Sequence, residues 1–262
     1  MKRPGALLAF LLLPALLAGC TGSSTFSGVT AEGAPDPAGD YAEAAPKKTA
    51  QGGFNPFEVR TEGPSPERQV IAEPTEAEIM ATGSLPEMAW GRADAPVTIV
   101  QYASLTCPYC RRFHKETFPQ LKREFIDTGK VRYILREFPI GKTSGAATIA
   151  LRCAKPEKYL ELYGKFLEQQ PKWVSQEVRH DPIFAVAQQV GMTRPQYDAC
   201  RENQAMIDGL KWVKDRGRTL GIIGTPNFFI GNKLVKKVLT IEEIRAMVAT
   251  SGNARTVAGV PG

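Results

Sequence analysis

The chain has 262 residues, of which 43% are hydrophobic and 23% are charged, and its formal net charge is +6 at pH 7. This composition is ordinary for a globular protein and rules out a mostly disordered or collagen-like chain. The only long apolar run lies at the N-terminus, so a polytopic membrane protein is ruled out as well. Five cysteines are too few for a disulfide-dense mini-protein, which makes their positions more informative than their number.

The N-terminus is typical of an export signal. Lys2 and Arg3 precede an apolar run over residues 6–18, which is short for a membrane span and suits the hydrophobic region of a signal peptide. Leu17-Ala18-Gly19-Cys20 resembles the lipobox of bacterial lipoproteins, in which the cysteine carries the lipid and becomes the first mature residue. We predict a signal peptide over residues 1–19, lipidation of Cys20 and a lipid-anchored place in the periplasm or cell envelope. An ordinary cleaved signal is the alternative, and in either case the mature chain lies where disulfides persist.

Residues 20–85 predict a flexible acidic tether, because they are rich in Gly, Pro, Ala, Ser, Thr and Glu and lack sustained periodicity. Residues 21–85 hold ten acidic and four basic side chains, and residues 1–20 carry two positive charges. Since the whole chain carries +6, the remainder carries +10. These basic side chains are scattered along the sequence, so we expect no binding to nucleic acid.

From about residue 86 the pattern becomes that of an α/β domain, which we expect to extend to residue 251. Residues 97–103 are β-rich and apolar and predict a buried strand. Residues 108–127 predict a helix kinked at Pro119, and residues 131–138 predict a second strand. This order of strand, helix and strand is one βαβ unit.

A helical insert over about 143–220 follows, because apolar residues recur there at steps of three and four. Two strands near 227–230 and 234–238 then flank Gly231-Asn232, which is a hairpin signal. Thr240 and Glu243 form a capping box before a final helix. We expect residues 252–262 to form a frayed tail.

The chemistry of the chain lies in Cys107-Pro108-Tyr109-Cys110. A zinc site would need two more closely spaced ligands, and the other candidates are scattered along the chain: Cys153, Cys200, His114 and His180. Attachment of c-type haem would need a histidine directly after the motif, where Arg111 stands. A purely structural disulfide within the motif stays an alternative. We expect no metal and no cofactor.

A redox role fits the place of the motif, which follows a predicted strand and begins a predicted helix. The first N–H groups of a helix lack intrahelical partners, and the helix dipole places partial positive charge there, so a thiolate at Cys107 is stabilised. The pKa of the Cys107 thiol should therefore be low. Pro108 suits the first helical turn, and Cys110 lies one turn further on, close enough to bond to Cys107.

With these features, residues 86 to about 250 resemble the DsbA-like thiol:disulfide oxidoreductases of the thioredoxin superfamily. The resemblance depends on Ala95-Pro96-Val97-Thr98-Ile99 leading to the motif, on the helical insert, and on the stretch from Gly224 to Gly231, which reads Gly-Thr-Pro-Asn-Phe-Phe-Ile-Gly. It implies a thioredoxin fold, βαβ…ββα, with the helical domain inserted after the first βαβ unit.

The resemblance also implies roles for particular residues. Pro226 would follow a cis peptide bond that faces the active-site disulfide, and Thr225 would offer its backbone to the substrate chain. Relatives often bury an acidic residue six positions before the first motif cysteine, where it helps to move protons. Here that position holds Gln101, whose amide cannot act as a base.

Cys153 and Cys200 form the remaining pair, and a similar pair occurs in some relatives as a second, non-catalytic disulfide. Such a bond would stabilise the fold by about 4 kcal/mol in the chain-entropy model. Two free buried thiols or a second redox pair are the alternatives. His114 and His180 are expected to be packing or surface residues.

The function expected is disulfide formation in exported proteins by dithiol/disulfide exchange. Its partners would be unfolded or reduced exported clients, a membrane redox partner that reoxidises the site, and the membrane itself through the lipid anchor. The same chemistry run as an envelope reductase or isomerase is the nearest alternative. A non-catalytic peptide-binding lipoprotein is a further one.

Overall fold

The computed structural model describes residues 70–258, with side chains up to Ser251. The predicted signal peptide, Cys20, most of the predicted tether and the last residues of the predicted tail lie outside the described residues.

The described part is built on one mixed sheet with the strand order β1-β3-β2-β4-β5. Strands β2 and β3 are parallel, whereas the other neighbours are antiparallel. Strands β2 and β3 are buried along nearly their whole length, and the polar side chains of Gln101, Arg136 and Glu137 are buried with their apolar neighbours. The strands are β1 (Met88–Trp90), β2 (Val97–Ala103), β3 (Val131–Glu137), β4 (Asn227–Ile230) and β5 (Lys233–Val235).

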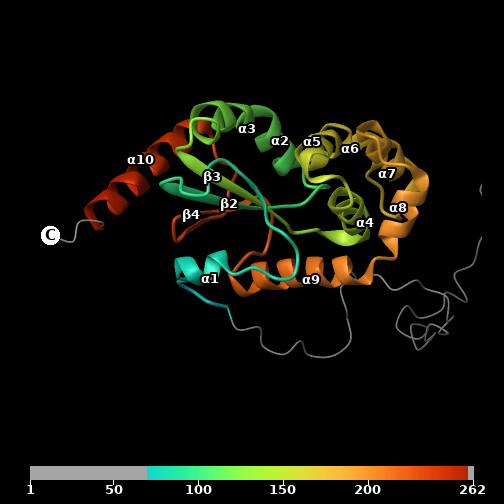
Figure 1. The fold of residues 1–262 in the computed structure, drawn as a ribbon, viewed down its shortest axis with the longest axis horizontal. Helices are drawn as coiled ribbons and strands as arrows, with labels where there is room; N and C mark the ends of the chain where they lie inside the picture. The colour runs from blue at the N-terminus through green and yellow to red at the C-terminus, as the bar shows by residue number, and fades with distance from the viewer. Residues whose placement is uncertain (1–69, 259–262) are drawn as a thin grey trace, which may run out of the picture. The chain divides into compact units, whose positions relative to one another are not determined.

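Helices cover both faces of the sheet (Figure 1). On one face lie α2 (Pro108–Glu116), α3 (Phe118–Leu121) and α10 (Ile241–Ala258), and on the other lie α1 (Glu76–Met80) and α9 (Gln204–Thr219). Alternate residues of the central strand β2 point to opposite faces of the sheet, and each set packs in the hydrophobic core on its own face. Ile99 packs in the core under α2, whereas Val100 and Tyr102 pack in the core under α1 and α9.

The helical insert connects β3 to β4 and forms the right-hand part of Figure 1. This arrangement confirms the predicted βαβ…ββα order with a helical insertion. Two short 3₁₀ turns, Pro156–Lys158 and Gln188–Val190, join its helices. The insert consists of α4 (Gly141–Arg152), α5 (Tyr159–Glu168), α6 (Gln170–Trp173), α7 (His180–Ala187) and α8 (Arg194–Arg201), and α9 leads back to the sheet.

The helix expected over 108–127 is broken into three pieces. It breaks at Thr117, between α2 and α3, and ends as a π-helical turn, Lys122–Ile126. The hydroxyl of Thr117 donates to the carbonyl oxygen of Leu239 at 2.9 Å, so this break is held by a contact distant in sequence. Pro119 lies in the first turn of α3, where its missing N–H leaves no bond unmade.

The tether was expected to reach residue 85, but the structure differs. Thr75 and Glu78 form a capping box that begins α1, and Ile79 is 2% exposed. Arg136 donates to the carbonyl oxygen of Ile79 at 2.5 Å, which secures the short helix to the sheet. A helix of five residues is too short to show periodicity in the sequence, and tertiary packing stabilises it.

Two further boundaries differ from the expectation. Strand β1 pairs with β3 at the sheet edge and was not predicted. Three residues carry too little of an alternating pattern to mark a strand. Helix α10 continues to Ala258, where a frayed tail was expected from residue 252.

Candidate active site

Cys107 is the N-cap residue of α2, just beyond the C-terminal end of β2. It is partly exposed, whereas Cys110 is fully buried, and both are thiols in this structure. Two backbone hydrogen bonds define the turn, from the N–H of Cys107 to Ser104 and from the N–H of Arg111 to Cys107, each at 3.1 Å. The motif therefore lies at a helix start, where its sequence predicted it.

The pKa of Cys107 is lowered to about 6. The largest cause is a hydrogen bond from the Cys110 thiol, and the Thr225 side chain and the backbone N–H groups of Cys110 and Tyr109 also lower it. Partial burial works in the opposite direction. Those two N–H groups are among the first-turn donors that a helix leaves without intrahelical partners, so the stabilisation expected from the helix start is present.

The pKa of Cys110 is raised well above its usual value, chiefly because burial penalises the thiolate. The neighbouring Cys107 also favours the neutral Cys110 thiol, through a hydrogen bond and through its charge. One turn of helix thus holds two thiols of different character. Cys107 can ionise near neutral pH and be attacked from solvent, whereas Cys110 keeps its proton.

The peptide bond between Thr225 and Pro226 is cis. The Cys107 Sγ donates to the carbonyl oxygen of Thr225 at 3.1 Å. The sheet brings these residues together, because β4 runs antiparallel to β2 with Tyr102 opposite Asn227. The start of β4 therefore lies beside the end of β2, and the segments that precede β4 and follow β2 meet at one edge.

Gln101 lies inside the sheet with no exposed surface, on the same face of β2 as Ile99. Its Oε1 accepts a hydrogen bond from the hydroxyl of Tyr133, while its Nε2 is buried without a partner among the described residues. Position 101 therefore holds an amide that accepts a hydrogen bond from Tyr133 but cannot act as a base.

The helical insert also stabilises the turn that holds Cys107. The insert itself was predicted from the sequence, but these contacts with the turn were not. Gln170, the first residue of α6, is buried and donates from Nε2 to the carbonyl oxygens of Leu105 at 2.7 Å and Cys107 at 3.1 Å. The hydroxyl of Ser104 lies 2.8 Å from that of Ser144 on α4. Nothing in the sequence around Gln170 signals this role, because its partners lie more than sixty residues away.

Cys153 and Cys200 are joined by a disulfide, with their Cα atoms 6.1 Å apart. It links the C-cap of α4 to α8, within the helical insert and away from the motif. His114 packs on Phe118 and Tyr163, and burial lowers its pKa to about 4. His180 contacts the Tyr197 hydroxyl at 2.9 Å. Both histidines are therefore packing residues in this structure.

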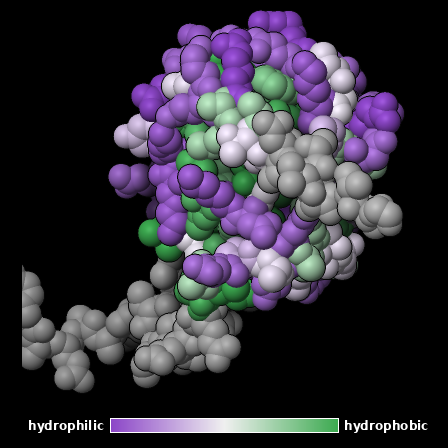
Figure 2. Space-filling model, turned by 90° about the vertical axis from the view of Figure 1, so that its left-hand side faces the viewer, coloured by the Kyte–Doolittle hydropathy of each residue, from purple (hydrophilic) through white to green (hydrophobic). Residues whose placement is uncertain are grey.

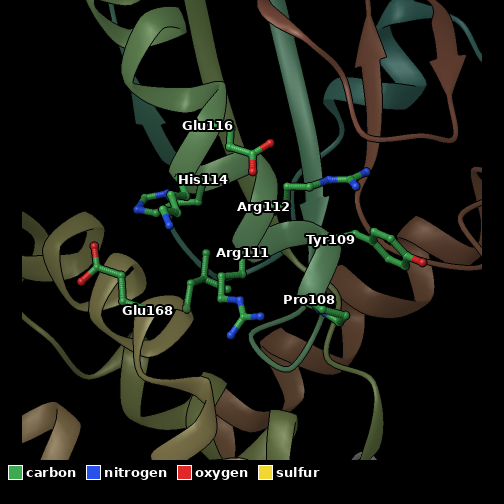
Figure 3. A pocket seen from close by; sticks show the side chains of 9 residues that line it. Pro108, Tyr109, Arg111, Arg112, His114, Glu116 and Glu168 are labelled. Carbon is green, nitrogen blue, oxygen red and sulfur yellow. The ribbon is translucent and has the colours of Figure 1, made fainter.

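A cavity of about 620 Å³ adjoins the motif between α2 and the end of α5 (Figure 3). The cavity is lined by Pro108, Tyr109, Arg111, Arg112, His114, Lys115, Glu116, Leu167 and Glu168.

Within residues 70–251 the structure holds no cluster of three or more His, Cys, Asp or Glu side chains that could bind a metal ion. None of the helices in the described range is long and apolar enough to cross a membrane.

Comparison with known proteins identifies relatives of the described domain. A family model described as Thioredoxin matches residues 84–250. The chain is 28% identical over 192 residues to a putative protein-disulfide oxidoreductase of Rickettsia bellii, which covers 71% of this chain and 73% of that protein. It is 32% identical over 149 residues to one of Rickettsia conorii, where it spans only 53% of the relative's length and 55% of its own.

More distant relatives share the fold. The chain is 25% identical over 165 residues to disulfide bond formation protein D of Bacillus subtilis, which covers 60% of this chain and 73% of that protein. The crystal structure of alpha-DsbA1 from Wolbachia pipientis superposes with a TM-score of 0.63 at 23% identity, over 70% of this chain and 98% of that one. The crystal structure of BdbD from Bacillus subtilis superposes with a TM-score of 0.58 at 22% identity, over 64% of this chain and 93% of that one.

Proposed function

Because the chain belongs to the thioredoxin family and is a DsbA-like thiol:disulfide oxidoreductase, we propose that it forms disulfide bonds in exported proteins through Cys107 and Cys110. The observation that carries this proposal is the contrast within the motif. Cys107 is accessible with a pKa lowered to about 6, and Cys110 is buried with a raised pKa. A sulfur that is stable as a thiolate is a good leaving group, which favours oxidation of clients.

The reaction begins from a Cys107–Cys110 disulfide. A client thiolate attacks Cys107 Sγ, the bond between the two motif sulfurs breaks, and Cys110 leaves with the electron pair and takes up a proton. A second client thiolate then attacks the client sulfur of the mixed disulfide, and Cys107 leaves as a thiolate. The client loses two electrons and the motif gains them, so a membrane redox partner must reoxidise the motif in each cycle.

The surface around Cys107 suits a protein client. Six large hydrophobic side chains are exposed in the described part, and three of them lie by the motif or its partner loops: Tyr109, Ile140 and Ile223. Ile140 follows Phe138-Pro139 after β3, and the Thr106 hydroxyl donates to its carbonyl oxygen at 3.4 Å. On the face shown in Figure 2 hydrophilic residues predominate, with apolar residues visible between them.

The Thr225 backbone supports the same proposal. Its carbonyl oxygen accepts from the Cys107 thiol, and that bond ends when Cys107 ionises or is bonded to a client sulfur. The freed carbonyl can then accept from a backbone N–H of an extended client, as strand addition to an open edge requires.

Two measurements test the direction of the reaction. The wild-type protein should oxidise a reduced two-cysteine peptide, and Cys107→Ala should lose that activity; full activity in this variant would reject the assignment. The reduction potential should lie well above the value of about −270 mV typical of thioredoxin. A potential close to that of thioredoxin would favour a reductase instead.

Location and anchoring are part of the proposal. Cys20 would carry the lipid, and residues 21–69 would tether the domain to the membrane in the cell envelope. Metabolic labelling with a fatty acid should mark the wild-type protein, and Cys20→Ser should abolish the label. A wild-type chain that takes up no label would reject the anchor and leave the enzymatic proposal standing.

A further inference from the structure

The cavity between α2 and the end of α5 lies directly beside the reacting sulfur. Pro108 and Tyr109, which follow Cys107 in the chain, form one end of it, and Leu167 and Glu168 form the opposite wall. Neither Thr225 nor Pro226 lines it. The cavity and the cis-proline loop are therefore separate features, and a client bound along the loop could place other side chains in the cavity.

Three cationic side chains line this cavity on the side of α2. Arg111, Arg112 and Lys115 make no ion pair with any residue of the described range, whereas many other basic residues there do. Arg112 lies over the ring of Tyr109, with 5.4 Å between the guanidinium carbon and the ring centroid. In Figure 3 the guanidinium of Arg111 extends from α2 into the space on the side of α5.

The remaining charged groups leave the cavity positive. Glu116 and Glu168 also line it, so its side chains sum to one positive charge. His114 adds none above about pH 5, because its burial keeps the imidazole neutral. The first turn of α2 holds no acidic residue, and the positive end of the helix dipole lies at the same place.

We propose that this cavity is a specificity subsite that takes an acidic side chain of the client, a few residues from its reacting cysteine. The inference rests on the proposed function, since it concerns the client of Cys107. An extended peptide advances about 3.3 Å per residue, so a neighbouring residue reaches the cavity from a cysteine at Cys107. Arg111 can hold a carboxylate through two parallel hydrogen bonds, and Tyr109 and Leu167 offer apolar walls to the methylene groups.

The experiment compares three reduced two-cysteine peptides that differ at one position beside the first cysteine, which holds Glu, Gln or Lys. The full chain in its disulfide form oxidises each peptide, and kcat/KM is measured at low and at high salt. We expect the Glu peptide to exceed the Gln peptide by about two- to fivefold and the Lys peptide to be slowest. High salt should reduce these ratios, because exposed charges are screened.

Variants assign the preference to the cavity. Arg111→Gln should bring the Glu-to-Gln ratio close to one, and Arg111→Glu should reverse the order in favour of the Lys peptide. Arg123→Gln is the matched control, because it removes the same charge from an exposed residue that does not line the cavity, and its ratios should equal those of the wild type.

The outcomes separate the two proposals. Equal oxidation of all three peptides, or an unchanged preference in Arg111→Gln, would overturn the subsite and leave the enzymatic proposal intact. No oxidation of any peptide by the wild-type disulfide form would overturn the proposed function and, with it, the subsite.

Discussion

The Cys107 sulfur lies 3.1 Å from the carbonyl oxygen of Thr225, a residue 118 positions later in the chain. The antiparallel pairing of β2 with β4 produces this contact, because it places the two flanking loops at one edge of the sheet. The thiol is thereby held between a helix start and a cis-proline loop. Its chemistry depends on both, and each can be altered separately.

The first prediction concerns the side chain of Thr225. Its hydroxyl is buried, forms no hydrogen bond of ordinary geometry within the described residues, and contributes to lowering the pKa of Cys107. Thr225→Val should therefore raise the pKa of Cys107, by up to about one unit. The pH dependence of thiolate ultraviolet absorbance measures this, and Thr225→Ser is the control that keeps the hydroxyl. An unchanged pKa in the valine variant would show that the hydroxyl does not stabilise the thiolate.

The pH dependence of alkylation provides the second prediction. Only the thiolate is nucleophilic, so the alkylation rate of the reduced protein should rise with pH, with its midpoint near pH 6, and level off about one pH unit higher. In Cys110→Ala the largest cause of the lowered pKa is gone, so the midpoint should move to higher pH. Cys153 and Cys200 are bonded to each other and should not react. A midpoint near pH 9 in the wild type would contradict the structure.

The buried amide at position 101 leads to a third prediction. Gln101→Glu places a carboxyl group in a fully buried site, where desolvation raises its pKa above that of the unfolded chain. A raised folded pKa means that the variant loses stability, relative to the wild type, as the pH rises above about 4.3. We expect a loss of about 1–3 kcal/mol at neutral pH. Urea unfolding at pH 4 and pH 7 measures it, and equal differences from the wild type at both pH values would refute the reasoning.

Gln170 carries the fourth prediction. Its amide bonds two carbonyl groups of the turn that holds Cys107, so Gln170→Leu should leave both without that donor and loosen the turn. We expect slower oxidation of a client peptide and a cost in unfolding free energy of about 1–3 kcal/mol. Gln169→Leu, whose amide bonds Gln189 and not the motif turn, is the control and should leave the rate of oxidation unchanged. Wild-type behaviour of both variants would show that the turn holds its shape without Gln170.

The disulfide of the helical insert yields the fifth prediction. Replacing both Cys153 and Cys200 by Ala should lower the free energy of unfolding by about 4 kcal/mol, since the bond closes a long loop in the unfolded chain. The folded variant should still oxidise clients, because the bond lies apart from Cys107. Guanidinium unfolding and peptide oxidation check these points. A variant that stays folded but cannot oxidise clients would indicate that the second pair takes part in the reaction.

Local signals in the sequence located much of the fold and the reactive motif. The apolar run of β2, the Gly231-Asn232 hairpin and the Thr240–Glu243 capping box each arise from neighbouring residues, and the structure has each of them. The position of Cys107 at the start of a helix is also local. The sequence alone therefore predicted this position. It also indicated the resemblance that the family match supports.

Other features depend on residues distant in the chain. The short helix α1, the edge strand β1 and the break at Thr117 are too brief to leave a periodic pattern, and packing against the sheet stabilises them. The bonds of Gln170 to the motif turn and the cavity between α2 and α5 likewise require the folded insert. The sequence could therefore indicate which sulfur reacts, because the helix start that favours its ionisation is local. Which groups hold that sulfur in place, and which charges surround it, depends on long-range contacts that form only as the chain packs.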